Sequence, residues 1–407
     1  MHPNVPHLRF PEFHGEWEKC KVSDLLDFYS TNSLSWDQLE YGTDNMLNLH
    51  YGLIHVGLPT MVDLSKDILP AIKKEKEPKN FELCKEGDIA FADASEDTNE
   101  VAKAIEFYTL EDKAVVCGLH TIHGRDKSNK TVVGYKGYAF SSTAFHHQIR
   151  RIAQGTKIYS ISAKNFAECY IGIPSKEEQT KIAKLLRLID ERIATQSKLI
   201  EKLESLIKGI NQRVFLNSGI NYKIREICEI KSGYSGSQLL SKKGLKVSRI
   251  ETISGHKVNM ERVGYVAPFE SSENYRLRVG DILFSNINSV EYIGNTAFID
   301  KDYDLYHGMN LLRLTPNNMV VIPFYLYLLL NTNRMLNRFK TVCNKAVSQA
   351  SINQTELGKT VVQIPPINTQ EQICELYQAL YTKLETESHT KSLFQNQKQY
   401  MLRQMFI

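Results

Sequence analysis

Long hydrophobic runs are missing from this chain, and so are grouped cysteines. The longest apolar run, Phe324 to Leu330, is far shorter than the roughly 20 residues that a membrane span needs. Residues 1–7 have no apolar core of a signal peptide, so we expect a cytoplasmic protein with no membrane partner. The seven cysteines are dispersed, with no Cys-x-x-Cys pair. This dispersal favours a reducing compartment and argues against both a disulfide framework and a zinc site.

Catalytic motifs are also absent. The sequence has no Gly-x-Gly-x-x-Gly, no phosphate-binding loop and no Asn/Asp-Pro-Pro-aromatic tetrad of an amino-methyltransferase. Asp67 with Glu77-Pro78-Lys79 imitates part of a nuclease site, but the triplet lies in a charged run that we interpret as a solvated loop. The pairs His146-His147 and His120/His123 lack a third ligand at metal spacing. We therefore expect no catalytic residue and no metal ligand.

Charge of one sign is not in large excess, since the formal net charge is only +4. Its distribution is uneven, because residues 1–112 carry 10 Lys/Arg and 22 Asp/Glu, whereas residues 113–174 carry 9 and 2. Residues 218–365 carry 18 and 12. Charge scatter over solvated faces is the alternative interpretation, but basic blocks at matching places in two halves favour a surface that binds a polyanion.

What the chain does contain is one phrase that occurs twice. Extended residues are followed by Ile-Pro, then by Glu-Gln, and then by a long helical pattern. The first copy comprises Ile161–Phe166, Ile173-Pro174 and Glu178-Gln179, and the second comprises Ile352–Leu357, Ile364-Pro365 and Glu371-Gln372. Pro174 and Pro365 are 191 residues apart, and Gln179 and Gln372 are 193 apart. This period indicates a duplicated domain with its helix, because solenoid repeats span about 20–50 residues.

Each copy leads into a long helix, predicted over residues 175–217 and 367–407. The first helix has apolar residues in steps of three and four, with Gln196 in the one gap, which is the pattern of a coiled-coil seam. The second seam is interrupted at Glu387, Lys391 and Lys398. We expect the two helices to pack antiparallel as an intramolecular coiled coil; the alternative is that each packs onto its own domain. The predicted seam positions are Ile182, Leu186, Ile189, Ile193, Gln196, Ile200, Leu203, Ile207, Ile210, Ile373, Tyr377, Leu380, Leu384, Phe394 and Met401.

The remaining segments, residues 1–174 and 218–366, form two mixed and mostly β domains in this prediction. Gly87-Asp88 and Gly280-Asp281 are matching turns, each followed by a short apolar strand. Gly118-Leu119-His120 and Gly308-Met309-Asn310 occupy similar later positions. Outside these matching segments the sequences of the two domains diverge. Two domains that share a frame but differ in their loops are suited to recognising two different things.

Loop residues of both domains are suited to DNA contact. Lysine, arginine and glycine-rich backbone serve phosphates, whereas Arg, Asn and Gln can contact base edges. For any single residue solvated surface is the alternative, and the set carries more weight than its members. In the first domain the candidates are Arg125, Lys127, Lys130, His146, Arg150, Arg151, Gln154, Gly155, Thr156 and Lys157. In the second they are Lys231, Ser232, Gly233, Ser235, Ser237, Lys242, Lys243, Arg249, Asn286, Asn288, Asn344, Lys345 and Gln349.

Over essentially the whole chain, this pattern resembles the specificity subunit of a type I restriction-modification enzyme. The resemblance rests on the two Ile-Pro and Glu-Gln closures with their helices, and on the opening segments Leu8–Phe13 and Gly15–Glu18. Ser175-Lys176 departs from it, since a second proline is commoner after the first Ile-Pro. The resemblance implies an α+β fold in which two similar mixed α/β target recognition domains are separated by two long antiparallel helices.

The resemblance also implies a function. Each domain would read one half of a bipartite site on double-stranded DNA, and the helices would space the domains and dock two methyltransferase subunits, through which nuclease-translocase subunits join. Catalysis would belong to those partners, which would use S-adenosylmethionine, ATP and magnesium, and this chain would bind no cofactor. Two alternatives are a non-DNA coiled-coil adaptor with two ligand-binding domains and a stand-alone site-specific nuclease or methyltransferase. The first would not explain the paired basic domains, and the second would need a catalytic motif.

Overall fold

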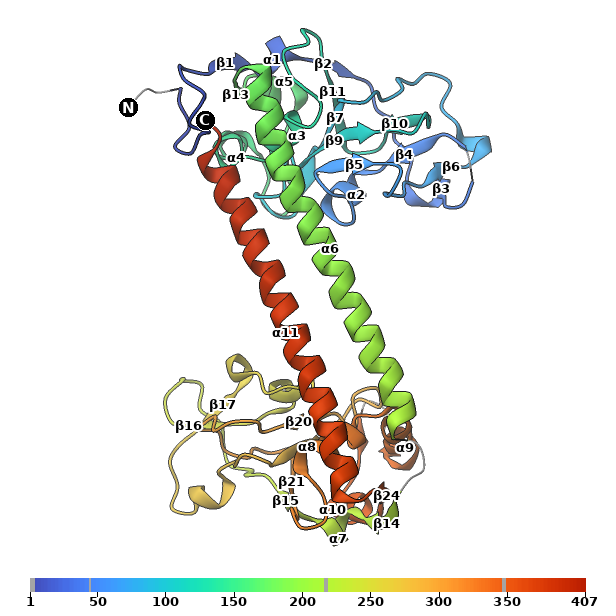
Figure 1. Cartoon of the computed structure of the whole chain (residues 1–407), viewed down its shortest axis with the longest axis vertical. Coiled ribbons are helices and arrows are strands. Elements are labelled where there is room, and N and C mark those ends of the chain that lie inside the picture. Colours follow the sequence, from blue (N-terminus) through green and yellow to red (C-terminus); the bar gives the residue numbers. More distant parts are fainter. Residues whose placement is uncertain (1–3, 44, 216–218, 346–348) are drawn as a thin grey trace. The chain divides into compact units, whose positions relative to one another are not determined.

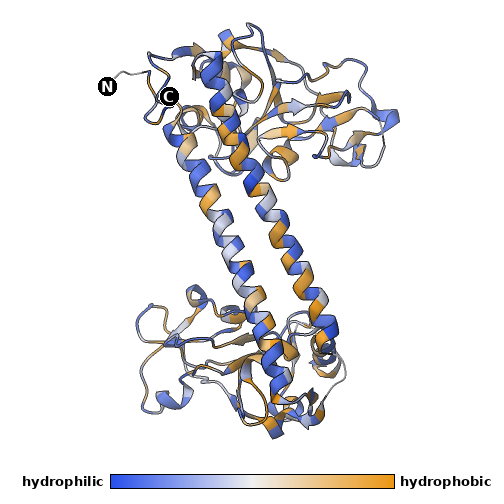
Figure 2. Ribbon diagram, in the orientation of Figure 1, coloured by the Kyte–Doolittle hydropathy of each residue, from blue (hydrophilic) through white to orange (hydrophobic). Residues whose placement is uncertain are grey.

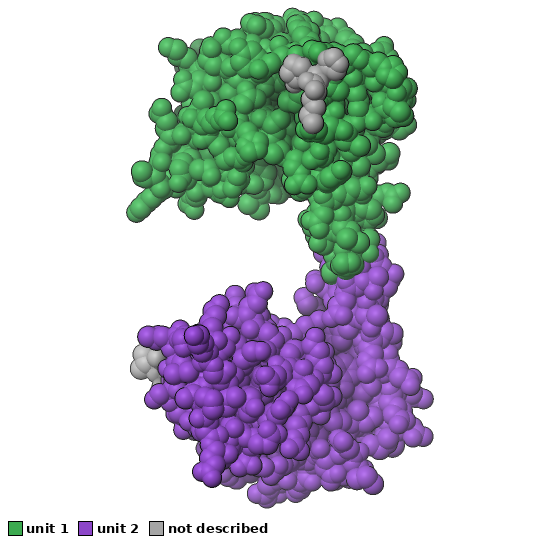
Figure 3. Space-filling model, turned by 90° about the vertical axis from the view of Figure 1, so that its left-hand side faces the viewer, with its two compact units in different colours: residues 1–198, 388–407 green, residues 199–387 purple. Residues whose placement is uncertain are grey.

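The computed structural model describes residues 4–43, 45–215, 219–345 and 349–407. The chain divides into two compact units (Figure 3), unit 1 with residues 1–198 and 388–407 and unit 2 with residues 199–387. Two long helices, α6 (Lys176–Val214) and α11 (Ile367–Gln404), each contribute residues to both units (Figure 1). Within the described ranges, no helix combines the length and the apolar character that crossing a membrane requires.

Unit 1 is built around a five-stranded sheet with the strand order β2-β11-β7-β9-β5. A four-stranded sheet, β10-β4-β6-β3, and the pairs β1-β13 and β12-β8 complete it. Its elements are β1 (Glu18–Lys21), α1 (Val22–Leu25), β2 (Leu26–Tyr29), β3 (Leu39–Glu40), β4 (Leu47–Leu49), α2 (Tyr51–His55), β5 (Met61–Asp63), β6 (Ala71–Ile72), β7 (Ile89–Ala92), β8 (Ala94–Ser95), β9 (Ala104–Thr109), β10 (Val115–Cys117), β11 (Thr121–Asp126), α3 (Lys136–Phe140), α4 (Thr143–Ile152), β12 (Tyr159–Ser160), α5 (Ala163–Ala167) and β13 (Tyr170–Ile173).

Unit 2 has a four-stranded sheet with the order β15-β21-β18-β20. A three-stranded sheet, β19-β23-β22, and the pairs β14-β24 and β16-β17 surround it. Its elements are β14 (Ile220–Lys223), α7 (Ile224–Ile227), β15 (Cys228–Ser232), β16 (Leu245–Val247), β17 (Gly264–Val266), β18 (Ile282–Ser285), β19 (Ile287–Asn288), β20 (Thr296–Phe298), β21 (Leu311–Pro316), α8 (Pro323–Leu330), α9 (Asn333–Val342), β22 (Asn344–Lys345), β23 (Ala350–Ser351), α10 (Gln354–Lys359) and β24 (Val361–Ile364).

The two units share four strands and the turn that precedes one of them, which we call the shared frame. Strands β2, β11, β7 and β9 occur in the same order as β15, β21, β18 and β20. Before β7 and β18, Gly87 and Gly280 have φ angles of +83° and +96°, a conformation that glycine adopts without strain. The next residue closes each turn, since Asp88 accepts a hydrogen bond from the Lys85 N–H (2.9 Å) and Asp281 one from the Arg278 N–H (2.9 Å). The predicted pair of Gly-Asp turns is therefore confirmed.

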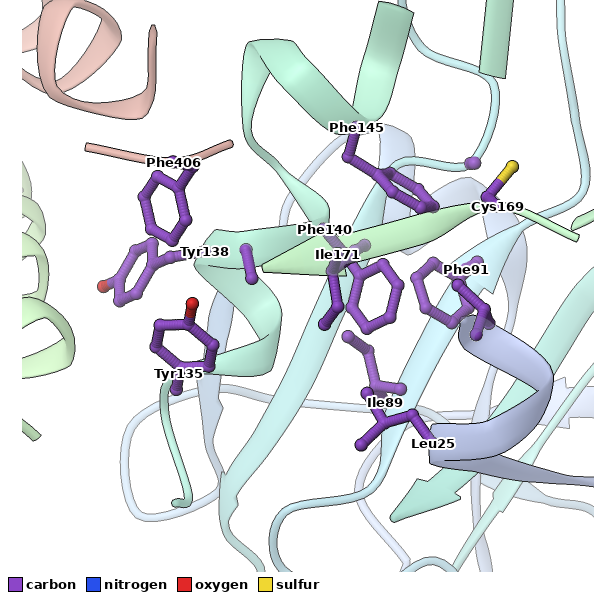
Figure 4. Packing of buried hydrophobic residues seen from close by; sticks show 14 of the residues in the cluster. Leu25, Ile89, Phe91, Tyr135, Tyr138, Phe140, Phe145, Cys169, Ile171 and Phe406 are labelled. Atoms are coloured by element: carbon purple, nitrogen blue, oxygen red, sulfur yellow. The ribbon is translucent and has the colours of Figure 1, made fainter. Parts of the chain in front are cut away.

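Aromatic rings fill the core of unit 1 behind its sheet. Figure 4 shows Phe91, Phe140 and Phe145 packed against one another, with ring centroids 4.9 Å apart for Phe91–Phe140 and 4.8 Å for Phe140–Phe145. The same cluster takes in Ile182 from α6 and Leu402 from α11. In unit 2 the corresponding cluster includes Ile207 from α6 and Tyr377 from α11, so both long helices complete a core in each unit.

A buried glutamine fixes the start of α6. The side-chain amide of Gln179 is fully buried and donates to the carbonyl oxygens of Lys130 (3.0 Å) and Pro174 (2.9 Å). Its oxygen accepts the backbone N–H of Val132 (2.9 Å). The glutamine of the first repeat phrase thus ties the helix to the end of β13 and to the loop before α3.

The equivalent residue at the start of α11 is Gln370, and this corrects the predicted pairing with Gln372. Gln370 is 1% exposed and donates to the carbonyl oxygens of Val320 (3.1 Å) and Pro365 (2.8 Å). Its oxygen accepts the Ile322 N–H (2.8 Å), whereas Gln372 lies exposed on the helix. The repeat therefore keeps the 191-residue spacing of Pro174 and Pro365 through its glutamines. In both units the buried glutamine stands five residues after the proline that follows the strand.

The predicted coiled-coil seam of α6 lies on the buried face of the helix. It was predicted over residues 175–217 and extends from Lys176 to Val214; residues 216–218 lie outside the described residues. Every predicted seam position of α6 is buried or half-buried, whereas Leu188 and Leu206 on its other face are exposed. Figure 2 shows the apolar residues of α6 spaced between hydrophilic ones.

On α11, the polar residues that interrupt the apolar seam are buried or half-buried, as the apolar seam residues are. Glu387 is only 8% exposed, and Lys391 and Lys398 are half-buried, in step with the apolar seam residues of this helix. In unit 1, Asp190 pairs with Lys398 (2.6 Å) and Arg192 lies over the Phe394 ring (5.6 Å), so residue numbers rise along α6 as they fall along α11. In unit 2, Tyr377 donates a hydrogen bond to Asn211. The predicted antiparallel pairing of α6 and α11 and the α+β fold class are confirmed.

Candidate nucleic-acid interface

Two polar hairpins occupy equivalent places in the two units. In unit 1, Gln154 bridges to Ser160 after the end of α4, and β12 pairs with β8; we call residues 154–160 the first hairpin. In unit 2, β22 pairs with β23 after the end of α9, and β23 pairs with β19; we call residues 344–351 the second hairpin, of which 346–348 lie outside the described residues. The preceding helices are also alike, since Ser142 caps α4 and Thr332 caps α9 through their hydroxyl oxygens.

The first hairpin presents the side chains of Gln154, Thr156 and Lys157 to solvent. Gly155 has a φ of +142°, and a Cβ built on it would lie 1.9 Å from the Ile158 carbonyl oxygen. This glycine is therefore required by the turn. The exposed arginines Arg150 and Arg151 precede the hairpin on the last turn of α4, so the structure brings these predicted residues together.

Two residues of α4 behave differently from what their sequence position suggested. Arg150 donates to Asn99 Oδ1 (3.1 Å) and to His147 Nδ1 (2.7 Å), so its guanidinium is already oriented on the surface. His146 is half-buried, and burial, followed by the nearby charge of Arg150, lowers the pKa of its imidazole. A half-buried imidazole is less accessible to a phosphate than its exposed arginine neighbours are.

The second hairpin gathers the amide side chains predicted in unit 2. Asn344, Lys345 and Gln349 are exposed, and Lys345 and Asn288 lie across from the same residue of β23. Asn288 donates to the Ser285 hydroxyl (3.1 Å), and its oxygen accepts the Ser289 N–H (2.8 Å). Asn286 directly precedes β19, and its carbonyl oxygen accepts the Ile352 N–H (2.9 Å). The side-chain amide of Asn288 is therefore already oriented by the protein itself.

Three other predicted basic residues of unit 1 contact groups of their own unit. Arg125, with 17% of its side chain exposed, pairs with Asp88 (2.8 Å) and with Glu82 (2.5 Å). Hydrogen bonds, first to Asp88 and then to Glu82, raise the pKa of Arg125 despite its burial. Lys127 donates to the Ser23 carbonyl oxygen (2.7 Å), and Lys130 pairs with Glu18. These three residues lie on β11 and the loop after it, whereas the first hairpin follows α4.

A second group in unit 2 extends from the last two residues of β15 to the turn after β16. Lys231, Ser232, Ser235, Ser237, Lys242, Lys243 and Arg249 are exposed there. The segment is anchored by Tyr234, whose ring stacks on Phe269 with centroids 4.0 Å apart. Gly233 allows a close approach, because a Cβ at this position would lie 1.8 Å from the Gly308 carbonyl oxygen. The structure therefore separates the unit 2 candidates into this segment and the second hairpin.

Sequence reasoning missed the basic face of α9. Arg334 and Arg338 are exposed on this helix and Lys340 is half-buried, while Met335 and Phe339 are buried on the opposite face. Arg338 donates to the Val361 carbonyl oxygen (2.8 Å), just as Gln148 of α4 donates to the Tyr170 carbonyl oxygen (2.8 Å). The period of the apolar residues in 333–342 was the available signal.

Comparison with known proteins identifies the family. The family described as "Type I restriction modification DNA specificity domain" matches residues 107–205 and 220–393, which together exceed half of the chain. This chain belongs to that family. Both hairpins fall within the matched residues of the specificity domain family.

Two relatives show how far the similarity extends. The chain is 36% identical over 193 residues to a Methanocaldococcus jannaschii protein provisionally named as the specificity subunit of the type I restriction enzyme MjaX, covering 46% of this chain and 45% of that protein. It is 24% identical over 283 residues to the type I restriction enzyme EcoKI specificity subunit of Escherichia coli, covering 62% and 59%. The chain thus spans 45% to 59% of the length of these two relatives.

Solved structures share the fold of this specificity domain protein. A type I restriction-modification S subunit from M. genitalium matches with a TM-score of 0.59 at 16% identity, covering 99% of both chains. A chain from a structure on complex assembly and conformational transition of the type I R-M system matches with a TM-score of 0.61 at 16% identity, covering 98% of both.

Proposed function

We propose that this chain is the sequence-specific DNA-binding subunit of a type I restriction-modification complex, in which each unit reads one half of a bipartite site. The observation that carries the proposal is the shared frame with unlike hairpins. Gln179 and Gln370 are held in the same way, yet the hairpins that follow α4 and α9 differ in sequence and length. A common frame with different contact residues is suited to reading two unrelated half-sites.

The exposed chemistry of the hairpins supports DNA as the ligand. Arginine and lysine neutralise phosphates, whereas asparagine and glutamine can make paired hydrogen bonds to adenine. The first hairpin region offers both kinds in Arg151, Gln154 and Lys157, and the second offers them in Asn344 and Lys345. A coiled-coil adaptor without DNA would not need these two matching sets.

We assign the chemistry of methylation and cleavage to partner subunits. The relatives' names are those of specificity subunits, which supports a chain that selects the site and leaves catalysis to others. On this proposal α6 and α11 space the units and dock two methyltransferase subunits, and nuclease-translocase subunits join through those. S-adenosylmethionine, ATP and magnesium would be used by the partners. None of the seven cysteines forms a disulfide, which favours a cytoplasmic location.

A domain exchange tests the proposal. Residues 219–365, which begin and end beside the β14-β24 pair, would be replaced by the equivalent domain of a relative, and the complex expressed with its methyltransferase subunits. Mapping of methylated adenines should then show one half of the recognised motif changed and the other half kept. Changes in both halves, or an unchanged motif, would overturn the assignment of one half-site to each unit. A matched exchange of residues 18–173 should alter the other half.

A further inference from the structure

A buried group of two cysteines and one histidine lies beside the sheet of unit 1. Cys117 ends β10, His123 lies in β11, and Cys84 pairs with β10 through its backbone N–H, which donates to the Val115 carbonyl oxygen (2.8 Å). The sulfur atoms of Cys84 and Cys117 are 3.6 Å apart, and with one ring nitrogen of His123 they all lie within 4.8 Å of one another. The residues are 6%, 2% and 0% exposed, respectively.

One ring nitrogen of His123 is held by a hydrogen bond, and the other is unpaired among the described residues. His123 Nε2 hydrogen-bonds to Asp88 Oδ2 (2.8 Å), and Asp88 is held in turn by Arg125 Nε (2.9 Å) and by the Lys85 N–H. Nδ1 of this fully buried ring has no hydrogen-bond partner among the described residues. An unpaired buried nitrogen is unfavourable unless something binds it, and a carboxylate on the opposite nitrogen is the usual support of a metal-bound imidazole.

We propose that Cys84, Cys117 and His123 bind one thiolate-preferring cation of the zinc class in unit 1. Tetrahedral coordination with zinc-sulfur bonds of about 2.3 Å places two sulfur ligands about 3.8 Å apart, close to the separation of these two sulfur atoms. Two sulfur ligands and one imidazole are the ligand types that zinc takes, and water would supply the fourth. The cation would join β10, β11 and the segment before the Gly-Asp turn.

The shared frame does not itself require these residues. In unit 2, Leu277 stands four residues before Asp281, as Cys84 does before Asp88. His307 precedes Gly308 as Cys117 precedes Gly118, and its Nε2 is engaged by the Leu311 carbonyl oxygen (2.9 Å). Arg313 takes the sheet position of His123, since each lies opposite the second residue of β18 or β7. Only unit 1 therefore has the ligand set among the described residues, and unit 2 shows that the frame forms with other residues there.

This proposed site differs from the prediction, made from cysteine spacing, that the chain has no zinc site. The scattered cysteines and the absence of a third ligand near His123 argued against zinc, because that reasoning considered ligands close together in sequence. Here Cys84 and Cys117 are 33 residues apart and meet only because β10 lies beside the segment of Cys84. Ligands brought together by strand pairing leave no spacing motif.

The test is a metal measurement on the full chain, prepared under reducing conditions with any co-purifying subunits. Zinc would be measured in the wild type, in Cys84→Ser with Cys117→Ser, and in Cys169→Ser, a buried cysteine of the same unit outside the group. The double variant should contain about one zinc ion fewer per chain than the wild type and the control. Preparing all proteins alike cancels zinc held by partner subunits in the difference.

A second readout does not depend on the variants folding. Wild-type protein reconstituted with Co²⁺ should show the intense sulfur-to-cobalt charge-transfer absorption of thiolate ligation, which Cys169→Ser should keep. Wild type that holds no zinc beyond its partners and gives no such absorption with Co²⁺ would overturn the proposal. So would mass spectra showing a Cys84–Cys117 disulfide in the reduced preparation.

Discussion

Gln179 and Gln370 make the same three hydrogen bonds in their own units. Each donates to the carbonyl of the proline that directly follows the preceding strand, donates to a loop carbonyl, and accepts an N–H two residues further along that loop. Because the nitrogen of the buried amide donates twice and its oxygen accepts, the side chain connects the end of the strand, the loop and the start of the helix. The repeated sequence motif therefore marks the hydrogen-bonded connection between each long helix and its domain.

Replacing either glutamine should weaken the unit that contains it. Gln179→Leu removes three hydrogen bonds and leaves buried backbone groups unpaired, so we expect a loss of about 2–4 kcal/mol in the free energy of unfolding. Gln372→Ala is the matched control on the exposed face of α11 and should change that free energy by less than about 0.5 kcal/mol. Urea denaturation measures both. A larger loss for Gln372→Ala than for Gln370→Leu would restore the original pairing of the repeat.

The arginines before the first hairpin should contribute to DNA affinity through phosphates. Arg150→Ala with Arg151→Ala should weaken binding and lower the magnitude of the slope of log K against log salt by about 1 for each lost contact. Lys74→Ala with Lys76→Ala removes the same charge from the solvated run and should leave the slope nearly unchanged. A titration of binding against salt concentration decides this. Lost preference at a single base position would instead assign these arginines to base readout.

Arg125 should matter for folding more than for DNA. Arg125→Met leaves Asp88 buried with one partner fewer, and breaking such a pair typically costs about 3–5 kcal/mol. The exposed fraction of Arg125 places the expected loss at the lower end of that range. The measurement is the free energy of unfolding, together with the salt slope of whatever folded protein remains. A normal stability with a reduced slope would return Arg125 to the DNA-binding set.

Local patterns in the sequence were sufficient for the frame but not for its partners. The seam of α6 and the turns at Gly87-Asp88 and Gly280-Asp281 could be predicted because periodicity and turn chemistry are written in neighbouring residues. Arg125 could not be separated from the surface arginines, because its acceptor, Asp88, lies 37 residues away. The choice of Gln370 over Gln372 could have been made from the sequence, because Gln370 lies three residues before the seam residue Ile373, as Gln179 does before Ile182.

Removing the proposed cation should destabilise unit 1 alone. A ligand at about 100 times its dissociation constant stabilises the folded state by about 2.7 kcal/mol, so a chelator should increase amide exchange in β10 and β11. Strand β21 of unit 2, which carries Arg313 at the position of His123, provides the internal control and should not change. Hydrogen exchange with and without chelator measures both at once. Equal effects on β11 and β21 would indicate a general action of the chelator.

The polar seam positions should set the register of the two helices. Gln196 is half-buried on α6, and Glu387 is buried on α11. An apolar residue suits a seam position, so Gln196→Leu should keep or raise stability, while polar seam residues usually fix alignment at some cost in stability. Thermal unfolding and the uniformity of the assembled complex are the two measurements. A variant that was markedly less stable yet equally uniform would refute a register role.

The helices should also set the spacing of the half-sites. Chain passes between the units after Lys198 in α6 and after Glu387 in α11, so inserting seven residues at both places keeps each seam in phase. Each insertion adds about 10 Å of helix, which equals about three base pairs of B-DNA. We therefore expect the spacer, the stretch of unread base pairs between the two half-sites of the methylated motif, to lengthen by about three base pairs. Four residues inserted into α6 alone, between Gln196 and Lys198, add about 6 Å and shift the seam relative to α11. That variant should lose activity or tolerate only one or two more base pairs. Methylation mapping of both variants decides: an unchanged spacer in an active seven-residue variant would show that the helices do not determine the distance between the half-sites.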